Sequence, residues 1–359
     1  MSASPAAALP DNLTDVREAH RFDEAALASY MKDHVEGFAG PLTVRQFDGG
    51  QSNPTFHLTD GRGRQYVMRK KPPGKLLPSA HAVDREFKVI SSVSKTDVPV
   101  ARAYCLCEDA SVIGTAFYVM EFLQGRIFRD PLMPECSPAE RGAITDHMND
   151  VLARLHKVDY KAVGLGDYGK QGQYFERQIA RWTSQYDLAK TEEIPEMERL
   201  KVWLPANIPP GSDETTIAHG DYRLENTIVH PTEPRIIAVL DWELSTLGHP
   251  LADLSYNCMI YHFGKGYGAT NGLAGHDVKA LGFPTEQEYL DAYCRRTGRD
   301  GIPFWDFYMA FSMFRLAGIA QGVYKRGLDG NSASTTALKF GNRARTLAEL
   351  AWNLIKHRA

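Results

Sequence analysis

One His, two Asp and one Asn in the segment 217–256 have types and a spacing that could carry chemistry. His219 and Asp221 follow a short apolar run, Asn226 stands five places after Asp221, and Asp241 directly follows the apolar run "IIAVL". A carboxylate that only accepts hydrogen bonds can orient and deprotonate a hydroxyl group, while further oxygen ligands hold Mg²⁺ against phosphates. The pattern therefore fits phosphoryl transfer to a hydroxyl.

The elements that must position these residues change character along the chain. Residues from about 42 to 119 form strand-like runs, "LTVRQF", "TFHLT", "QYVMR", "RAYCLCED" and "AFYVMEFL", interrupted by one helical segment, "SAHAVDREFKVISSVS". After "EFLQGR" the patterns are mainly helical, over 137–159 and about 172–187, 286–297, 304–325 and 334–355. We expect an α+β protein with two lobes. The predicted parts are an N-terminal arm (1–25), a β-rich lobe (26–120), a connecting segment (121–126) and a helical lobe (127–359).

The motif "HGDYRLEN" followed by "DWE" resembles the aminoglycoside phosphotransferase and choline kinase branch of the protein-kinase-like fold. Its spacing is that of the kinase catalytic loop, H-x-D-x-x-x-x-N, and "DWE" stands where protein kinases have DFG. The resemblance implies that Asp221 is the base, that Asn226 and Asp241 are Mg²⁺ ligands, and that Asp253 supports the catalytic loop from a buried position. His219 is expected to be structural.

The first lobe offers residues for binding ATP. "DGGQSNPTF" is similar to the small-residue loop that covers the phosphates, with Gly50 and Ser52 as candidates. In "QYVMRKK", strand alternation places Val67 and Arg69 on one face, which resembles the Ala and Lys of the kinase motif V-A-I-K. The resemblance implies that Arg69 contacts the phosphates, with Lys70 and Lys71 as competitors.

Two further groups complete the expected nucleotide site. Glu86, in the helical segment, is expected to pair with the cation, and "MEFLQG" resembles the hinge, in which Glu121 and Leu123 present backbone groups to adenine. The expected cofactors are ATP and Mg²⁺.

A closer resemblance rests on "GQSNPTF", "RKKPPG", "GLGDYG", "RQIARW" and "FRLAGIAQGVYKR". These motifs look like the phosphotransferase domain that some animal proteins carry ahead of an acyl-CoA dehydrogenase. The resemblance implies a hydroxylated acyl-CoA or a hydroxy acid as acceptor; an aminoglycoside or choline-type kinase and a catalytically silent nucleotide-binding module are the alternatives.

The acceptor is expected to contact residues 160–187 and 256–275. Residues 256–275 contain no Asp or Glu, which disfavours a polycationic aminoglycoside. Two arginines four places apart, Arg177 and Arg181, are equally consistent with a solvated helix face and with anion binding. The aromatic and cationic candidates are Tyr174, Phe175, Trp182, Tyr186, Tyr261, Phe263, Tyr267 and Lys265.

Composition excludes several other classes of protein. The net charge is −3 without a long run of like charges, so we expect a small-molecule hydroxyl substrate and neither nucleic acid nor membrane as partner. Five cysteines without a C-x-x-C pair indicate neither a disulfide framework nor a zinc site, and Cys105 and Cys107 are expected to be packing residues. "GLGDYGKQ" lacks the Ser or Thr of a P-loop. The N-terminus does not resemble a signal peptide, and a cytoplasmic location is expected.

Overall fold

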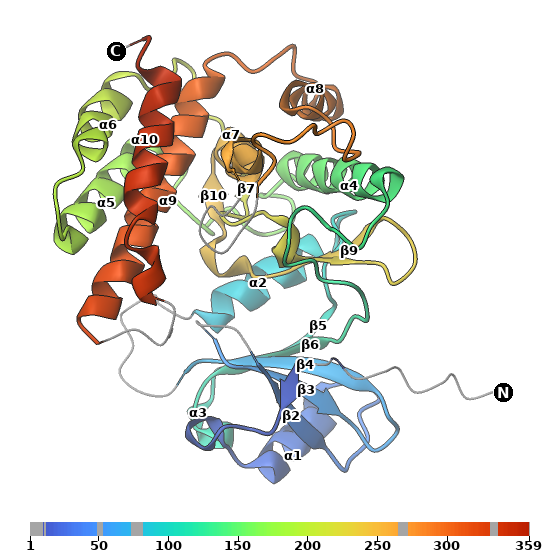
Figure 1. Ribbon diagram of the computed structural model, residues 1–359. Helices are drawn as coiled ribbons and strands as arrows, with labels where there is room; N and C mark the ends of the chain where they lie inside the picture. The colour runs from blue at the N-terminus through green and yellow to red at the C-terminus, as the bar shows by residue number, and fades with distance from the viewer. Residues whose placement is uncertain are drawn as a thin grey trace. The chain divides into compact units, whose positions relative to one another are not determined.

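The computed structural model describes residues 10, 12–48, 53–72, 82–264, 272–330 and 337–358 (Figure 1). The chain divides into two compact units. Unit 1 comprises Met1–Gly125 and Ile237–Glu243, and unit 2 comprises Arg126–Ile236 and Leu244–Ala359.

Unit 1 is built on a six-stranded antiparallel sheet with the strand order β1-β2-β3-β4-β6-β5. All five predicted strands are present. The elements are β1 (Leu13–Thr14), η1 (Glu18–His20), α1 (Glu24–His34), β2 (Thr43–Phe47), β3 (Thr55–Thr59), β4 (Gln65–Lys70), α2 (Val83–Val93), β5 (Ala103–Cys107), α3 (Ala110–Ile113) and β6 (Phe117–Glu121).

The alternation of side chains in β4 divides the sheet into two chemically different faces. Tyr66 and Met68 belong to the apolar cluster that also contains Leu27 and Met31 of α1. Arg69 points to the face covered by α2, where it meets Glu86. Cys105 and Cys107 are free thiols in the apolar cluster, so their predicted packing role is confirmed.

Unit 2 is mainly helical. Its elements are α4 (Pro138–Lys157), α5 (Tyr174–Ala189), α6 (Pro195–Ala206), β7 (Thr216–Ala218), η2 (Leu224–Asn226), β8 (Thr227–Val229), β10 (Thr246–Gly248), α7 (Pro250–Cys258), η4 (Met259–His262), α8 (Glu286–Thr297), α9 (Trp305–Leu328), η5 (Ala337–Phe340) and α10 (Arg343–Ile355). Strand β9 (Ile236–Val239) and helix η3 (Trp242–Leu244) lie where the chain passes between the units.

Helix α9 is the central helix of unit 2, as its apolar sequence predicts. It packs against α5, α7 and α10, and α9 and α10 lie side by side in Figure 1. Among the described residues, no helix combines the length and the apolarity that a membrane crossing needs.

Two predicted details of unit 2 are wrong. The predicted helix 334–355 is instead η5 followed by α10, which begins at Arg343, and residues 331–336 lie outside the described residues. Gly341 separates the two elements, and a Cβ there would lie 3.0 Å from the ring of Tyr324. Residues 250–258, over which no helix was predicted, form α7.

Candidate functional site

Three residues predicted to serve the nucleotide meet in unit 1. Arg69 Nη1 lies 3.0 Å from Glu86 Oε2, and Nη1 and Nη2 each donate to Asp241 Oδ1 at 3.3 Å. The Glu86 side chain is 1% exposed and also accepts hydrogen bonds from Asn53 Nδ2 (2.6 Å) and Tyr118 Oη (2.9 Å). The Arg69 guanidinium therefore links the buried carboxylate of Glu86, on α2, to the carboxylate of Asp241, whose side chain is 38% exposed.

Opposite forces set the protonation of this cluster. Burial raises the pKa of Glu86 more than the charge of Arg69 and the hydrogen bonds from Tyr118 and Asn53 lower it. Burial lowers the pKa of Arg69, but the acidic groups of Tyr118, Glu86 and Asp241 outweigh that effect and raise it overall. Because its pKa rises, Arg69 stays a cation, which is the state that binding of an anion would require.

The backbone at Asp241 holds its carboxylate in an unusual position. Asp241 has φ +62°, in the left-handed region that side-chain-bearing residues seldom adopt. The following residue, Trp242, is 1% exposed, and its Nε1 donates to Val239 O at 3.0 Å, which fixes the turn after β9. Such strained positions concentrate at functional sites because the surrounding contacts maintain them.

The other predicted nucleotide residues are placed with less detail. Glu121 ends β6, where its amide donates to Arg102 O at 2.8 Å, and Leu123 is half-buried two residues later. Gly50 and Ser52 lie outside the described residues. Lys70 is on the opposite face of β4 from Arg69, with its Nζ 5.3 Å from the centre of the Phe22 ring.

The catalytic-loop motif in unit 2 is held by a buried carboxylate. Asp253, on α7, is 2% exposed and accepts hydrogen bonds from the amides of His219 (2.5 Å) and Gly220 (2.7 Å). Burial would raise the pKa of Asp253, but the hydrogen bond and charge of His156, with His219 and the Gly220 amide, lower it overall. The support role predicted for Asp253 is confirmed.

Glycine is required at position 220. Gly220 has φ +84°, and a Cβ there would lie 2.7 Å from Leu244 O. Arg315, on α9, donates to Gly220 O at 2.7 Å. The loop is therefore held from one side by its amides and from the other by its carbonyl.

Asp221 and Asn226 are brought together as their spacing predicts. Asn226 Nδ2 donates to Asp221 O and Oδ2, both at 2.9 Å. Arg223 Nε lies 3.2 Å from Asp221 Oδ1. Because both donations use the Asn226 amide nitrogen, Oδ1 of Asn226 is the atom suited to a cation, which fits the predicted ligand.

No cluster of three or more His, Cys, Asp or Glu that could hold a metal occurs within the described ranges. A Mg²⁺ ion carried by a nucleotide needs only one or two protein oxygens, since phosphates and water supply the rest. Asn226 in unit 2 and Asp241 in unit 1 each offer an oxygen of the type that Mg²⁺ prefers.

Several residues that support the loop or the pair of Arg69 and Glu86 were not found from sequence. No motif singled out Arg315, Asn53 or Tyr118. His156 is hydrogen-bonded through Nδ1 to Tyr293 Oη (2.7 Å), and its Nε2 lies 3.4 Å from Asp253 Oδ2. Their partners are 32 to 137 positions away in sequence, so no local pattern marks them.

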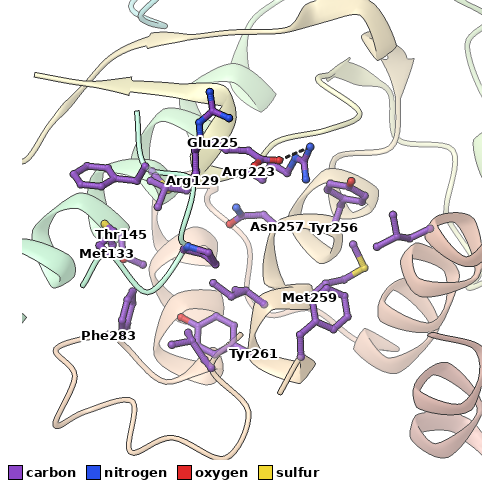
Figure 2. Close-up of a pocket in the computed structure, with 18 of the residues that line it drawn as sticks. Arg129, Met133, Thr145, Arg223, Glu225, Tyr256, Asn257, Met259, Tyr261 and Phe283 are labelled. Atoms are coloured by element: carbon purple, nitrogen blue, oxygen red, sulfur yellow. Dashed lines mark ion pairs between the residues drawn. The ribbon is translucent and has the colours of Figure 1, made fainter. Parts of the chain in front are cut away.

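A cavity of about 490 Å³ lies within unit 2 beside the catalytic loop (Figure 2). Arg223, Leu224 and Glu225 of the loop line it, together with Tyr256 and Asn257 of α7. Most of its lining is apolar or aromatic, and the polar members among the described residues are Arg129, Thr145, Arg223, Glu225, Asn257 and Arg343. Its size is typical of a small-molecule site.

Tyr256 lies between this cavity and the carboxylate of Asp221. Burial is the main cause of the raised pKa of Tyr256, and the carboxylate of Asp221 raises it further. Asn257 joins the same wall to the loop, since its Nδ2 donates to Tyr222 O (3.2 Å) and its Oδ1 accepts from Tyr289 Oη (2.6 Å). A molecule in the cavity would therefore contact the residues that hold the loop.

The aromatic residues of the predicted acceptor region divide between the cavity and the core. Tyr261 and Phe263 line the cavity, but Tyr174, Phe175 and Tyr186 are buried in the core of unit 2 and do not line it. Helix α5 turns these aromatic rings inward: the Phe175 ring, for example, packs 5.0 Å from that of Phe311.

The remaining candidates of this region divide three ways. Arg177 donates to the carbonyls of Lys170 (2.9 Å) and Gly172, which gives it a structural role, and Arg181 lies over the ring of Trp182. Lys265 and Tyr267 lie outside the described residues.

Comparison with known proteins identifies relatives of this chain. The model of the phosphotransferase enzyme family (APH) matches residues 43–311. Acyl-CoA dehydrogenase family member 10 of Mus musculus is 47% identical over 343 residues, which are 95% of this chain and 32% of that protein. The chain thus spans about a third of this relative's length and under half that of the human family member 11.

Solved structures share the fold. A crystal structure from Ralstonia eutropha JMP134, provisionally described as an aminoglycoside phosphotransferase, is 56% identical with a TM-score of 0.87 and covers 94% of this chain and 99% of its own. A thermostable mutant of aminoglycoside phosphotransferase APH(4)-Ia, in a ternary complex with ADP and hygromycin B, has a TM-score of 0.60 at 13% identity over 92% of this chain and 98% of its own. The predicted α+β, protein-kinase-like fold is confirmed.

Proposed function

This chain belongs to the phosphotransferase enzyme family, and we propose that it transfers the γ-phosphate of ATP to the hydroxyl of a hydroxyacyl substrate, as a free hydroxy acid or its CoA ester. The observation that carries the choice of acceptor is the largely apolar cavity beside the catalytic loop.

Asp221 is the proposed general base. The Asn226 amide donates to Asp221 Oδ2 and to the Asp221 carbonyl, which fixes the direction of the carboxylate. The acceptor hydroxyl, bound in the cavity next to Tyr256, would donate its proton to Asp221 as its oxygen attacks the γ-phosphorus of ATP. The bond from that phosphorus to the β–γ bridging oxygen would break, and ADP would leave. The loop backbone, held by Asp253 and Arg315, keeps the base in place during that step.

Arg69 is proposed to bind the phosphates of ATP, in a position fixed by Glu86. Mg²⁺, when bound with the nucleotide by Asn226 and Asp241, would neutralise the developing charge on the phosphates. Glu121 and Leu123 would present backbone groups to adenine, and Gly50 and Ser52 would cover the phosphates. ADP in the ternary complex of APH(4)-Ia supports a nucleotide as donor.

The charges of the cavity favour an acyl acceptor over the alternatives. Among the described lining residues, Glu225 is the one carboxylate, and three arginines, Arg129, Arg223 and Arg343, accompany it. A polycationic aminoglycoside would need a wall rich in carboxylates, and a choline-type cation would be repelled by the guanidinium groups even where aromatic rings attract it. An acyl chain with a carboxylate or CoA phosphates fits both the apolar wall and the cations. The relatives named for acyl-CoA support the same class.

The experiment is a substrate panel read by mass spectrometry. Purified protein with ATP and Mg²⁺ is incubated with hydroxy fatty acids, their CoA esters, kanamycin and choline, each with Asp221→Asn protein as the control. We expect phosphorylated hydroxyacyl product from the wild type, and from the variant a rate lower by about 10² to 10⁴.

Two results would change the conclusion. Phosphorylation of kanamycin or choline alone would replace the acceptor and keep the kinase assignment. Nucleotide binding without product from any acceptor would support the alternative of a catalytically silent nucleotide-binding module.

A further inference from the structure

We propose that Phe283 closes the apolar end of the cavity and sets the longest acyl chain that the enzyme accepts. This inference rests on the proposed hydroxyacyl acceptor. It adds a specificity-determining residue that does not belong to the catalytic loop.

The cavity has a catalytic end and an apolar end. Figure 2 shows the Arg223–Glu225 ion pair on one side and Phe283 on the opposite side, with Met133 and Thr145 next to Phe283. Because the catalytic loop must meet the hydroxyl, an acyl chain would extend from that loop towards Phe283. Arg129 is exposed and labelled beside Glu225, so an acid or CoA group could leave the cavity there.

The segment that carries Phe283 is fixed by its backbone. Gly282 has φ +92°, and a Cβ there would lie 2.0 Å from Pro138 O at the start of α4. Arg141 Nη1 donates to Leu281 O at 3.2 Å, and the Phe283 amide donates to Val278 O at 2.8 Å. The wall is therefore attached directly to α4.

A second attachment comes from within the cavity wall. Tyr261 Oη, from η4, donates to Pro284 O at 3.1 Å, so the residue after Phe283 is also held. Phe283 itself is 4% exposed and packs between these attachments. An acyl chain that reaches the Phe283 ring cannot displace this wall without breaking these hydrogen bonds. The length of the acyl chain is therefore limited sterically.

The size of the expected effect follows from methylene burial. Each extra CH₂ that fits into an apolar pocket contributes about 0.8 kcal/mol, which is roughly fourfold in kcat/KM. In the wild type, kcat/KM should rise by up to that factor per carbon and then fall once the chain reaches Phe283. Phe283→Ala should move this maximum to longer chains, and Phe283→Trp should move it to shorter ones.

The test measures kcat/KM over a series of hydroxy fatty acids that share one hydroxyl position and differ in chain length. The variants are Phe283→Ala, Phe283→Leu and Phe283→Trp, with Phe283→Leu as the milder change should the alanine variant fold poorly. Phe304→Ala is the matched control, because Phe304 is 43% exposed and is not a lining residue of the cavity. Circular dichroism spectra confirm that each variant is folded.

The inference would be supported if the chain length of maximal kcat/KM increased in Phe283→Ala or Phe283→Leu and decreased in Phe283→Trp, and did not change in Phe304→Ala. A chain-length profile that is unchanged in folded Phe283→Leu and Phe283→Trp proteins, while hydroxyacyl product still forms, would overturn the inference and leave the proposed function intact. A wild type that phosphorylates no hydroxyacyl compound would overturn both.

Discussion

Because Arg69 and Glu86 form a buried ion pair in unit 1, removal of the Arg69 charge should destabilise the protein. In Arg69→Met, the Glu86 carboxylate loses its cation while its side chain stays 1% exposed. Removal of one partner from a buried ion pair costs about 3–5 kcal/mol, because the other charge stays in the interior. Since burial already raises the pKa of Glu86, part of that cost is relieved as Glu86 takes up a proton.

The double variant Arg69→Met/Glu86→Gln separates structure from function. The introduced amide would carry no charge. Its oxygen could accept from Asn53 Nδ2, and its nitrogen could donate to Tyr118 Oη, because a phenol hydroxyl also accepts hydrogen bonds. We therefore expect the double variant to recover most of the stability that the single variant loses. ATP binding should be lost in both variants, because the cation proposed for the phosphates is absent from each.

Stability is measured by thermal unfolding followed by circular dichroism, and ATP binding by calorimetric titration. The single variant should unfold at least roughly 5 °C below the wild type. Lys70→Ala is the control for nucleotide binding, since Lys70 lies on the opposite face of β4, and it should bind ATP almost as the wild type does. A double variant no more stable than Arg69→Met, or a Lys70→Ala protein that binds ATP more weakly than Arg69→Met, would refute this reasoning.

Three further outcomes are expected. Mg²⁺ and ATP together should raise Tm more than ATP alone, because the proposed oxygen ligands would bind the metal only together with the phosphates; equal shifts in thermal scans with and without Mg²⁺ would contradict this. Asp253→Asn should destabilise the protein near neutral pH, and the loss of stability should be smaller below about pH 4. The pKa of Asp253 is lower in the folded protein than in the unfolded chain, so its carboxylate stabilises the fold above the unfolded pKa. That stabilisation is lost as the pH falls through the folded pKa. A stability difference that is constant between pH 7 and pH 3 would count against it. Arg315→Gln should lower kcat with little change in KM for ATP, because Arg315 holds the Gly220 carbonyl; an unchanged kcat would remove Arg315 from the support of the loop.

Local periodicity explains what could be predicted of the fold. The alternation of β4 separates Arg69 from Lys70, and the structure places them on opposite faces as that alternation requires. Helix α7 was missed because eight of its nine residues are buried, so it lacks the polar face that marks a helix in sequence. Helix α1 was missed because only Leu27 and Met31 are buried on it.

Residues of the candidate site could be predicted only where they belong to a sequence motif. Asp221, Asn226 and Asp253 follow from the catalytic-loop motif and its resemblance. In the structure Asn226 Nδ2 donates to Asp221 Oδ2, and Asp253 accepts from the amide of Gly220. Arg315 lies 95 positions from its partner Gly220, so no spacing rule can find it. The aromatic residues of α5 were misplaced because composition gives the number of rings in a region and not the face on which they lie.

The central claim is that Asp221 activates a hydroxyl for attack on ATP. The most direct test is a single-turnover experiment with radiolabelled γ-phosphate, a hydroxyacyl acceptor and either wild-type or Asp221→Asn protein, with ATP affinity measured in parallel. The account predicts that label passes to the acceptor in the wild type, that transfer in the variant slows by about 10² to 10⁴, and that the two proteins bind ATP equally. Transfer by Asp221→Asn within a few-fold of the wild-type rate would contradict it.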